Sequence, residues 1–245
     1  MGTLPSTGED LGGASSLLLG LADGRFPAGG HAHSGGLEEA VADGRARTLE
    51  DLQAFLVGRL HTAGLIDATF AAFSWLAAAS PARLAEVHAE AVARWPSPAQ
   101  RDSSRAQGRS LLRAARNVWP TMDFAGIAEV AGHVRGGPMY AVVLGAVGKG
   151  IGLDLRQVAL VAAQGSVTGP AWASTRLLGL DPFAVARSVS ELAPAIDKTA
   201  IGSVVQAQVA FGRDGNGAEL AACAAPLLEI GAERQAQWEV RLFAS

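Results

Sequence analysis

The sequence predicts an all-α protein, a single-domain helical bundle of about 8–11 helices. Ala, Leu and Gly dominate the composition, and runs of β-branched residues are scarce. Sustained two-residue alternation, which is typical of half-buried strands, is hard to find, whereas apolar residues often recur every three or four positions. The chain has 245 residues, of which 49% are hydrophobic and 18% charged, so one well-buried core suffices.

The clearest helical pattern runs from Thr48 to Ala79. Thr48 is suited to be its N-cap, with Asp51 three positions later, and apolar residues then follow at steps of three or four. Two shorter helices are expected before it and eight after it, most of them beginning or ending at Pro, Gly or Asp. They are Ser16–Asp23, Gly35–Asp43, Pro81–Trp95, Pro98–Trp119, Phe124–His133, Pro138–Gly152, Leu155–Leu178 with a break at Pro170, Asp181–Leu192, Pro194–Gly212 and Glu219–Phe243.

Two stretches are apolar nearly all round, Pro138–Gly152 and Leu155–Ala173. Helices of this kind occupy the centre of a bundle. They also contain several Gly residues, each of which costs about 1 kcal/mol relative to Ala in a helix interior. Close helix packing would explain these glycines, although a general bias in composition would explain them equally well.

Charge and hydropathy exclude several classes of protein. Twenty basic and 23 acidic residues give a net charge of -3 without long runs of either sign, so the sequence predicts neither nucleic-acid binding nor attraction to anionic lipid. Gly, Arg, Asp or Pro interrupts every apolar run before it reaches the roughly 18 residues of a membrane span. We therefore expect neither a nucleic-acid partner nor a membrane.

The N-terminus and the single cysteine indicate a cytoplasmic protein. Residues 1–15 are rich in Gly, Ser and Thr and lack a basic region before an apolar core, which is unlike a signal peptide. We expect them to be a disordered tail, with the helical domain spanning 16–245. Cys223 cannot form an internal disulfide and is expected to be a buried thiol, as suits a reducing cytosol.

The sequence does not assemble an obvious active site. The run from Gly145 to Gly152 has a Gly-Lys pair, but a phosphate-binding P-loop would require Gly in place of Val143 and Ser or Thr in place of Gly150. Cys223 has no base nearby in sequence, and paired carboxylates occur only in the N-terminal tail or at helix starts. We expect no catalytic residues, although a helical enzyme with a small-molecule pocket built from distant residues remains an alternative.

His31 and His33 are the only candidates for metal binding. Two imidazoles separated by one residue could share nickel or zinc, but no Cys/His cluster supplies further ligands. Alternatively, His33 and Ser34 cap the helix that starts near Gly35. The capping reading is preferred, and a nickel-storing metallochaperone is kept as the rival function.

Three segments of the chain carry a family resemblance, and a weaker match lies at Met139–Leu153. The first ends in Pro27-Ala-Gly-Gly-His-Ala-His-Ser-Gly-Gly-Leu-Glu38. The second is Arg176-Leu-Leu-Gly-Leu-Asp181, and the third is Glu233-Arg-Gln-Ala-Gln-Trp-Glu-Val-Arg-Leu-Phe-Ala-Ser245. Together, and in this order, they resemble the UreF family of urease accessory proteins. Two departures stand out: His31 takes the place of an aromatic residue, and Gly179 that of a Pro.

The resemblance implies an all-α protein without catalytic activity or a tightly bound cofactor. It implies a complex with the accessory protein UreD, also called UreH, in which UreF dimers recruit the GTPase UreG. This complex would handle nickel and deliver it into apo-urease. The residues that the resemblance assigns to partner binding are His31, His33, Ser34, Glu38, Arg176, Arg234, Arg241, Leu242 and Phe243.

The last residues, about 233–245, are expected to form a partner-docking segment that is loosely ordered in the free protein. They mix charged residues with Trp238, Leu242 and Phe243, which is too apolar for a lone tail and too polar for a core helix. Arg241 would be the polar anchor, because a charge-assisted hydrogen bond helps to offset the entropy of ordering. The alternative is that the last helix packs on its own bundle.

Overall fold

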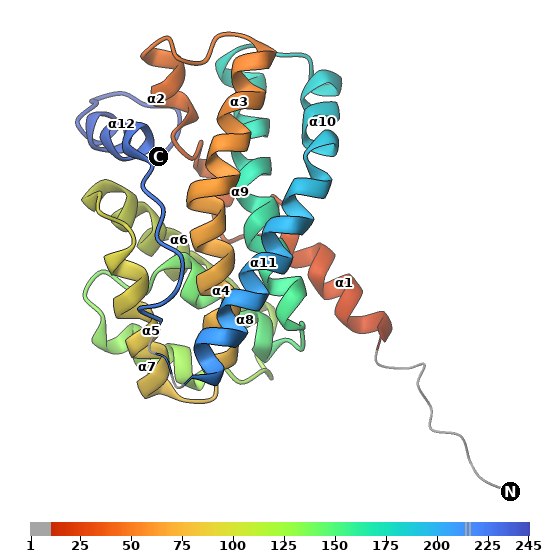
Figure 1. The fold of residues 1–245 in the computed structure, drawn as a ribbon, viewed down its shortest axis with the longest axis vertical. Coiled ribbons are helices and arrows are strands. Elements are labelled where there is room, and N and C mark those ends of the chain that lie inside the picture. Colours follow the sequence, from red (N-terminus) through yellow and green to blue (C-terminus); the bar gives the residue numbers. More distant parts are fainter. Residues whose placement is uncertain (1–10, 214, 216) are drawn as a thin grey trace, which may run out of the picture.

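The computed structural model describes residues 11–213, 215 and 217–245, and these residues form helices without any strand (Figure 1). The all-α prediction is confirmed. A short 3₁₀ turn, Gly30–Ala32, precedes α2, and a π turn, Leu60–Gly64, joins α3 to α4. The α-helices are α1 (Leu11–Ala22), α2 (Leu37–Ala42), α3 (Leu49–Arg59), α4 (Leu65–Ala77), α5 (Pro81–Ala93), α6 (Pro98–Val118), α7 (Ala125–His133), α8 (Tyr140–Gly150), α9 (Leu155–Leu177), α10 (Pro182–Glu191), α11 (Ala193–Gly212) and α12 (Pro226–Ala236).

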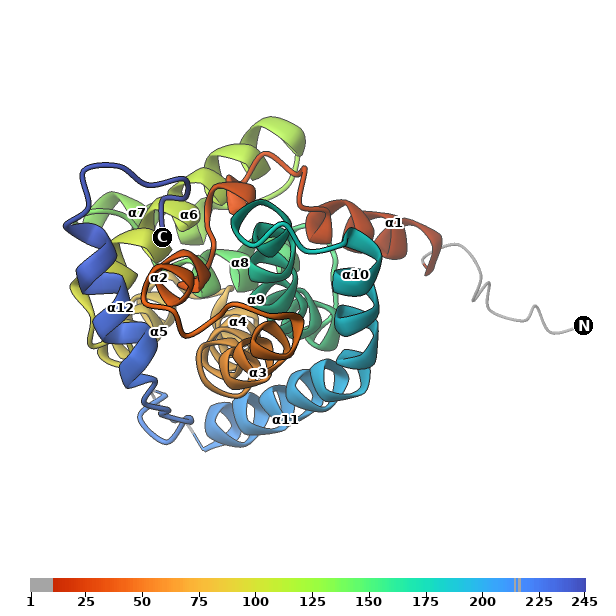
Figure 2. The same ribbon diagram turned by 90° about the horizontal axis from the view of Figure 1, so that it is seen from above.

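Helices α4, α8 and α9 form the centre of the bundle. Seen from above, the other helices surround them, with α11 and α12 on the outside (Figure 2). Helix α4 packs on α8, α9 and α11, and its Phe70 and Phe73 are fully buried. The central position predicted for the two apolar stretches, which form α8 and α9 as far as Ala173, is confirmed.

A glycine sets the approach of α8 to α4. A Cβ at Gly145 would lie 2.7 Å from the Cβ of Ser74 and 2.9 Å from the backbone nitrogen of Trp75, and it would overlap the carbonyl oxygen of Ala71. No residue with a side chain fits this contact without moving one helix. The packing explanation for the glycine-rich helix therefore holds at Gly145.

The long helix predicted from Thr48 begins as expected. The Thr48 hydroxyl accepts a hydrogen bond from Asp51 N at 3.2 Å, and the Asp51 carboxylate accepts one from Thr48 N at 3.0 Å, which is a capping box. The π turn at Leu60–Gly64 was not predicted. At this turn Gly64 lies directly against the Ser166 side chain of α9, so that any larger residue would collide with it.

The break predicted at Pro170 is wrong, because α9 continues through it. Proline has no N–H to donate to the carbonyl of Ser166, four residues earlier. The Arg59 side chain replaces that donor: its Nε donates to Ser166 O at 3.0 Å, and its Nη1 donates to Gly35 O at 2.7 Å. One guanidinium from α3 thus binds the free carbonyl of α9 and also holds the loop before α2.

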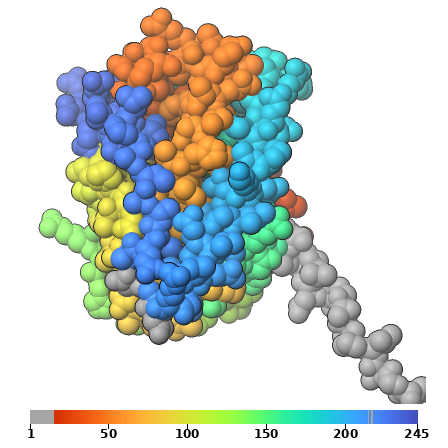
Figure 3. Space-filling view, viewed as in Figure 1, coloured from red at the N-terminus to blue at the C-terminus, as the bar shows by residue number. Residues whose placement is uncertain are grey.

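The last predicted helix, Glu219–Phe243, is much shorter in the structure. Only Pro226–Ala236 is helical, since Pro226 marks the first turn and the chain leaves the helix after Gln237. Before it, residues 217–225 run along the outside of the bundle between α5 and the α3–α4 helix (Figures 1 and 3). Arg94 holds this stretch by donating to Gly217 O and Ala218 O at 3.1 and 3.0 Å. Cys223 lies in it and is half-buried, not fully buried as expected.

The N-terminal boundary also differs from the prediction. Helix α1 begins at Leu11, so residues 11–15, which were expected to be disordered, are helical, and residues 1–10 lie outside the described part. The other helix boundaries agree with the sequence to within about three residues. Within the described ranges, no helix is long and apolar enough to cross a membrane.

Candidate partner-binding site

The end of the chain lies against the loop that precedes α2. The main-chain oxygen of Ser245 accepts hydrogen bonds from Ser34 N at 2.5 Å, from Gly35 N at 3.1 Å and from the Ser34 hydroxyl at 2.9 Å. Ala244 N donates to Ala32 O at 2.7 Å. Gly35 adopts φ +63°, a conformation that glycine reaches easily, and this turns its N–H toward Ser245. Two segments about 200 residues apart in sequence are thereby tied together.

His33 holds the same end of the chain through its ring. Its Nδ1 lies 2.7 Å from the Ser245 hydroxyl and 3.1 Å from the Ser103 hydroxyl of α6. Burial, with a smaller contribution from the positive charges of His31, Arg59 and Arg241, lowers the pKa of His33 to about 4. The ring is therefore neutral near pH 7 and engaged with two serines.

The Glu38 carboxylate, in the first turn of α2, binds the last residues from the other side. It accepts hydrogen bonds from Leu242 N at 2.7 Å, from Phe243 N at 3.1 Å and from the side-chain amide of Gln235 at 2.8 Å. Glu38 is only 7% exposed. Its own N–H donates to the Ser34 hydroxyl at 3.2 Å, so Ser34 contacts the first turn of α2. The predicted cap by His33 and Ser34 is wrong, because Gly36 is the N-cap and His33 bonds elsewhere.

The last residues present one buried and one exposed apolar side chain. Phe243 is 5% exposed, and the Arg176 guanidinium lies over its ring at 5.3 Å from the centroid. Leu242 is 61% exposed. The predicted free segment that orders only on a partner is therefore corrected: this chain itself supplies the acceptors and the pocket that hold Phe243. The alternative, packing on the chain's own bundle, describes the structure better, although here a loop and not a helix makes the contact.

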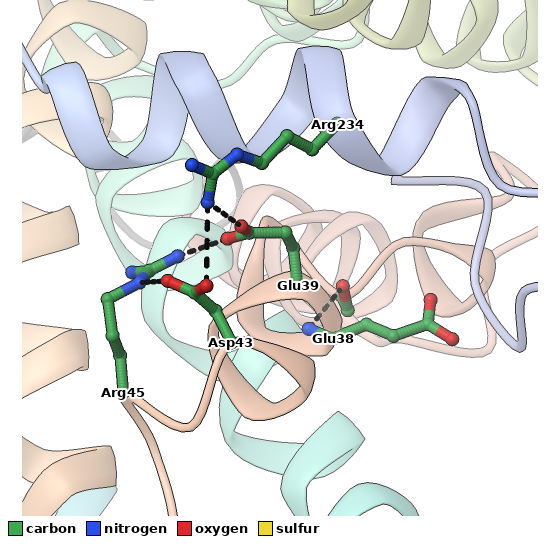
Figure 4. Close-up of polar contacts among 6 residues, drawn as sticks. Glu38, Glu39, Asp43, Arg45 and Arg234 are labelled. Carbon is green, nitrogen blue, oxygen red and sulfur yellow. Dashed lines mark hydrogen bonds and ion pairs between the residues drawn. The ribbon is translucent and has the colours of Figure 1, made fainter.

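A second polar cluster ties α12 to α2 (Figure 4). Arg234 lies 3.6 Å from Glu39 and 3.4 Å from Asp43, and Arg45 contacts the same two carboxylates, at 2.8 Å in the case of Asp43. Arg234 was predicted from the sequence as a site residue, whereas Glu39, Asp43 and Arg45 were not. The adjacent glutamates Glu38 and Glu39 were the signal that could have identified Glu39, but the helix dipole also accounts for carboxylates at a helix start.

We call residues 31–38, Arg176 and residues 234–245 the C-terminal site. The model of the UreF family matches residues 46–193, more than half of the chain. The urease accessory protein UreF of Mycobacterium sp. (strain JLS) is 42% identical over 230 residues, which cover 94% of this chain and 98% of that protein. The proteins of the same name from Mycolicibacterium vanbaalenii and Mycobacterium marinum are 41% and 40% identical, with the same coverage. The chain belongs to the UreF family.

In this UreF-family chain, the residues assigned to partner binding fall into two sets. Ser34, Glu38 and Phe243 are buried, and His33 is half-buried, so these four hold the site together. The other five are exposed and available to a partner, and they are His31, Arg176, Arg234, Arg241 and Leu242. The structure brings Arg176 and the C-terminal segment together at the Phe243 ring.

The surroundings of His31 and His33 bear on the metal-binding alternative. Among the described residues, no group of three or more His, Cys, Asp or Glu side chains is arranged to hold a metal ion. His33 Nδ1 already contacts two serine hydroxyls, which leaves its other ring nitrogen as the possible ligand. The geometry supports an anchoring role for His33 in this UreF-family chain.

Proposed function

We propose that the chain is a non-catalytic adaptor that acts with a UreD/UreH-type protein to recruit the GTPase UreG and to support nickel insertion into apo-urease. Family membership supports the role in urease maturation. Relatives that match nearly the whole chain are urease accessory proteins, which are maturation factors and not enzymes. The chain therefore has a role in urease maturation. How it recruits its partners is the subject of the rest of the proposal.

The observation that supports GTPase recruitment is the composition of the outer face of the C-terminal site. Val240 and Leu242 are 86% and 61% exposed, and the exposed cations Arg176 and Arg241 accompany them. Arginine is enriched where proteins meet and is suited to desolvated contacts with carboxylate or phosphate, and the exposed apolar side chains beside it would gain from burial against a partner. A nucleotide-binding protein offers both groups.

The buried side of the site explains how this face stays presented. Glu38 binds the backbone of Leu242 and Phe243, and Ser34 and Gly35 bind Ser245, so the exposed side chains start from a fixed backbone. Ordering a residue costs about 1–2 kcal/mol of backbone entropy. Because this chain has ordered the segment already, a partner would not bear that cost.

The remaining parts of the proposal concern cargo, assembly and location. Nickel is the cargo of the complex, and the chain holds no cofactor tightly. Two copies act together in the complex, and the complex works in the cytoplasm, where a single unpaired cysteine is chemically at home. Equilibrium dialysis of the isolated chain against nickel tests the cofactor statement, and tight one-to-one binding would contradict it.

Co-purification tests the adaptor role. The tagged chain is expressed with UreD-type and UreG-type proteins, and the ternary complex is isolated by size-exclusion chromatography. The proposal expects Arg176→Ala and Leu242→Ser to reduce the UreG-type protein in the complex at least tenfold with the melting temperature unchanged to within about 2 °C. Arg187→Gln, an exposed arginine on α10, is the matched control. Full recruitment by both site variants would remove this face from the proposal.

A further inference from the structure

Helix α6 carries an arginine stripe, which we define as Arg101, Arg105, Arg109, Arg113 and Arg116. These are five of the chain's 20 basic residues, and Asp102 is the only acidic residue in the helix. Spacings of four, four, four and three residues place the five side chains on one side of the helix. The chain as a whole has a net charge of -3, so the stripe is a local reversal of sign.

The described part of the chain neutralises little of this charge. Arg101 donates to the carbonyl oxygens of Trp95 and Pro96, and Arg109 donates to that of Gly136, none of which carries a formal charge. Arg105 forms an ion pair with Asp102 at 3.4 Å, and its buried Nε has no hydrogen-bond partner among the described residues. Arg113 and Arg116 are exposed and have no ion pair among the described residues. The outer half of the stripe is therefore free to meet an anion.

A groove of about 720 Å³ lies beside these free arginines. Arg109, Arg113, Arg116 and Asn117 from α6 line it together with Leu112, Ala131 of α7 and the loop Gly136–Pro138. Gly136 and Gly137 have φ values of +82° and +89°. A Cβ on Gly137 would lie 3.1 Å from Arg109 Cδ and still closer to Cγ, so the glycine lets the stem of Arg109 lie flat on the loop. The groove has an apolar floor and a cationic rim.

We propose that this groove and stripe bind an acidic segment of a partner protein, whose carboxylates contact Arg109, Arg113 and Arg116. At a rise of 1.5 Å per residue, Arg109 to Arg116 extends over roughly 10 Å of helix. That distance exceeds a single phosphate or carboxylate and matches about three residues of extended chain at roughly 3.3 Å each. The planar guanidinium groups suit carboxylates, and the apolar floor suits the methylene groups of glutamate.

This surface is separate from the C-terminal site. Ser103, which contacts His33 and Ser245, lies about 15 Å along α6 from Arg113 at 1.5 Å per residue. An adaptor with two separate surfaces can hold two partners at once, so the inference goes beyond the proposed function. It also makes no use of Arg176 or Leu242.

Fluorescence anisotropy of a fluorescein-labelled decaglutamate peptide tests the inference with the full chain. We expect saturable binding that weakens as ionic strength rises and that drops about tenfold in the double variant Arg113→Gln/Arg116→Gln. The matched control is Arg156→Gln/Arg187→Gln, which removes two exposed arginines from α9 and α10. Circular dichroism should show that both variants keep their helices, because none of the four side chains makes an ion pair or hydrogen bond with the part of the chain that the structure describes.

Three results would overturn the inference. The first is no binding at low salt, and the second is an equal loss in the stripe and control variants, which would show that net charge alone attracts the peptide. The third is tighter binding of pyrophosphate or of a single-stranded oligonucleotide than of the peptide, measured by competition. Each result would be independent of whether the C-terminal site recruits a GTPase.

Discussion

Replacing Glu38 should release the end of the chain. Its carboxylate accepts three hydrogen bonds, from Gln235, Leu242 and Phe243, at 2.7 to 3.1 Å. In Glu38→Ala all three donors lose their acceptor at a position that is only 7% exposed. In Glu38→Gln the shape is kept, but Oε1 and Oε2 both accept bonds in the native protein. The new NH₂ group therefore faces a donor whichever way the amide turns.

The expected loss in free energy of unfolding depends on how far the released C-terminal segment can recover. Hydrogen bonds to a charged group contribute about 1.5–3 kcal/mol each, so three bonds set an upper bound of roughly 5–9 kcal/mol. Once the segment is released, however, its donors reach water and its backbone regains entropy, and these two gains offset most of the lost hydrogen bonding and of the lost burial of Phe243. We therefore expect Glu38→Ala to lower the free energy of unfolding by about 2–4 kcal/mol, or roughly 5–15 °C in Tm.

Hydrogen exchange and thermal unfolding together provide the assay. The amides of Leu242 and Phe243 should lose protection in both variants, whereas those of the central α8 should keep theirs. Glu86→Ala is the control, because Glu86 is an exposed glutamate on α5 and its loss should change Tm by less than about 2 °C. If the Leu242 and Phe243 amides stay protected and Tm does not change, Glu38 does not hold the segment and the reasoning fails.

Three further predictions follow from the same structure. Gly145→Ala should destabilise by about 1–3 kcal/mol in chemical denaturation because its Cβ would meet α4, whereas Gly132→Ala, with open space at its Cβ, should be neutral or stabilising. Arg59→Met should cost about 2–4 kcal/mol, since the carbonyls of Ser166 and Gly35 lose their donor, and an unchanged midpoint would contradict the account of α9. Because burial lowers the pKa of His33 to about 4, below its unfolded value near 6.5, its contribution is complete above pH 6.5 and is lost as the pH falls toward 4. Wild type should therefore lose about 1–2 kcal/mol more than His33→Gln between pH 7 and pH 5, and parallel curves would show that His33 does not titrate in this way.

Much of the fold could be predicted because it depends on local rules. Periodicity and capping residues located most of the helices, and the Thr48–Asp51 capping box appears where the sequence placed it. The errors arose where a distant residue overrides a local rule. Pro170 should break a helix by itself, but Arg59, more than 100 residues earlier, donates to the carbonyl that proline leaves free. No reading of α9 alone could have found that donor.

The candidate site shows the same division. Resemblance selected residues in three separate segments, and the structure brings His33, Glu38 and Arg176 into contact with the end of the chain. Sequence could not tell which of them face inward. Phe243 is apolar and near the chain end, and only the packing shows that this chain covers it and leaves Leu242 exposed.

Urease activation in cells tests the central claim most directly. A bacterium with a nickel urease but without its own UreF-type protein would express this chain together with the matching UreD-type and UreG-type proteins, and urease activity would be measured with nickel supplied. The account predicts that the wild-type chain and Arg187→Gln restore activity, and that Arg176→Ala and Leu242→Ser restore less than about a tenth of it at equal protein level. Full activity in both site variants, or none with the wild-type chain alongside its matched partners, would contradict it.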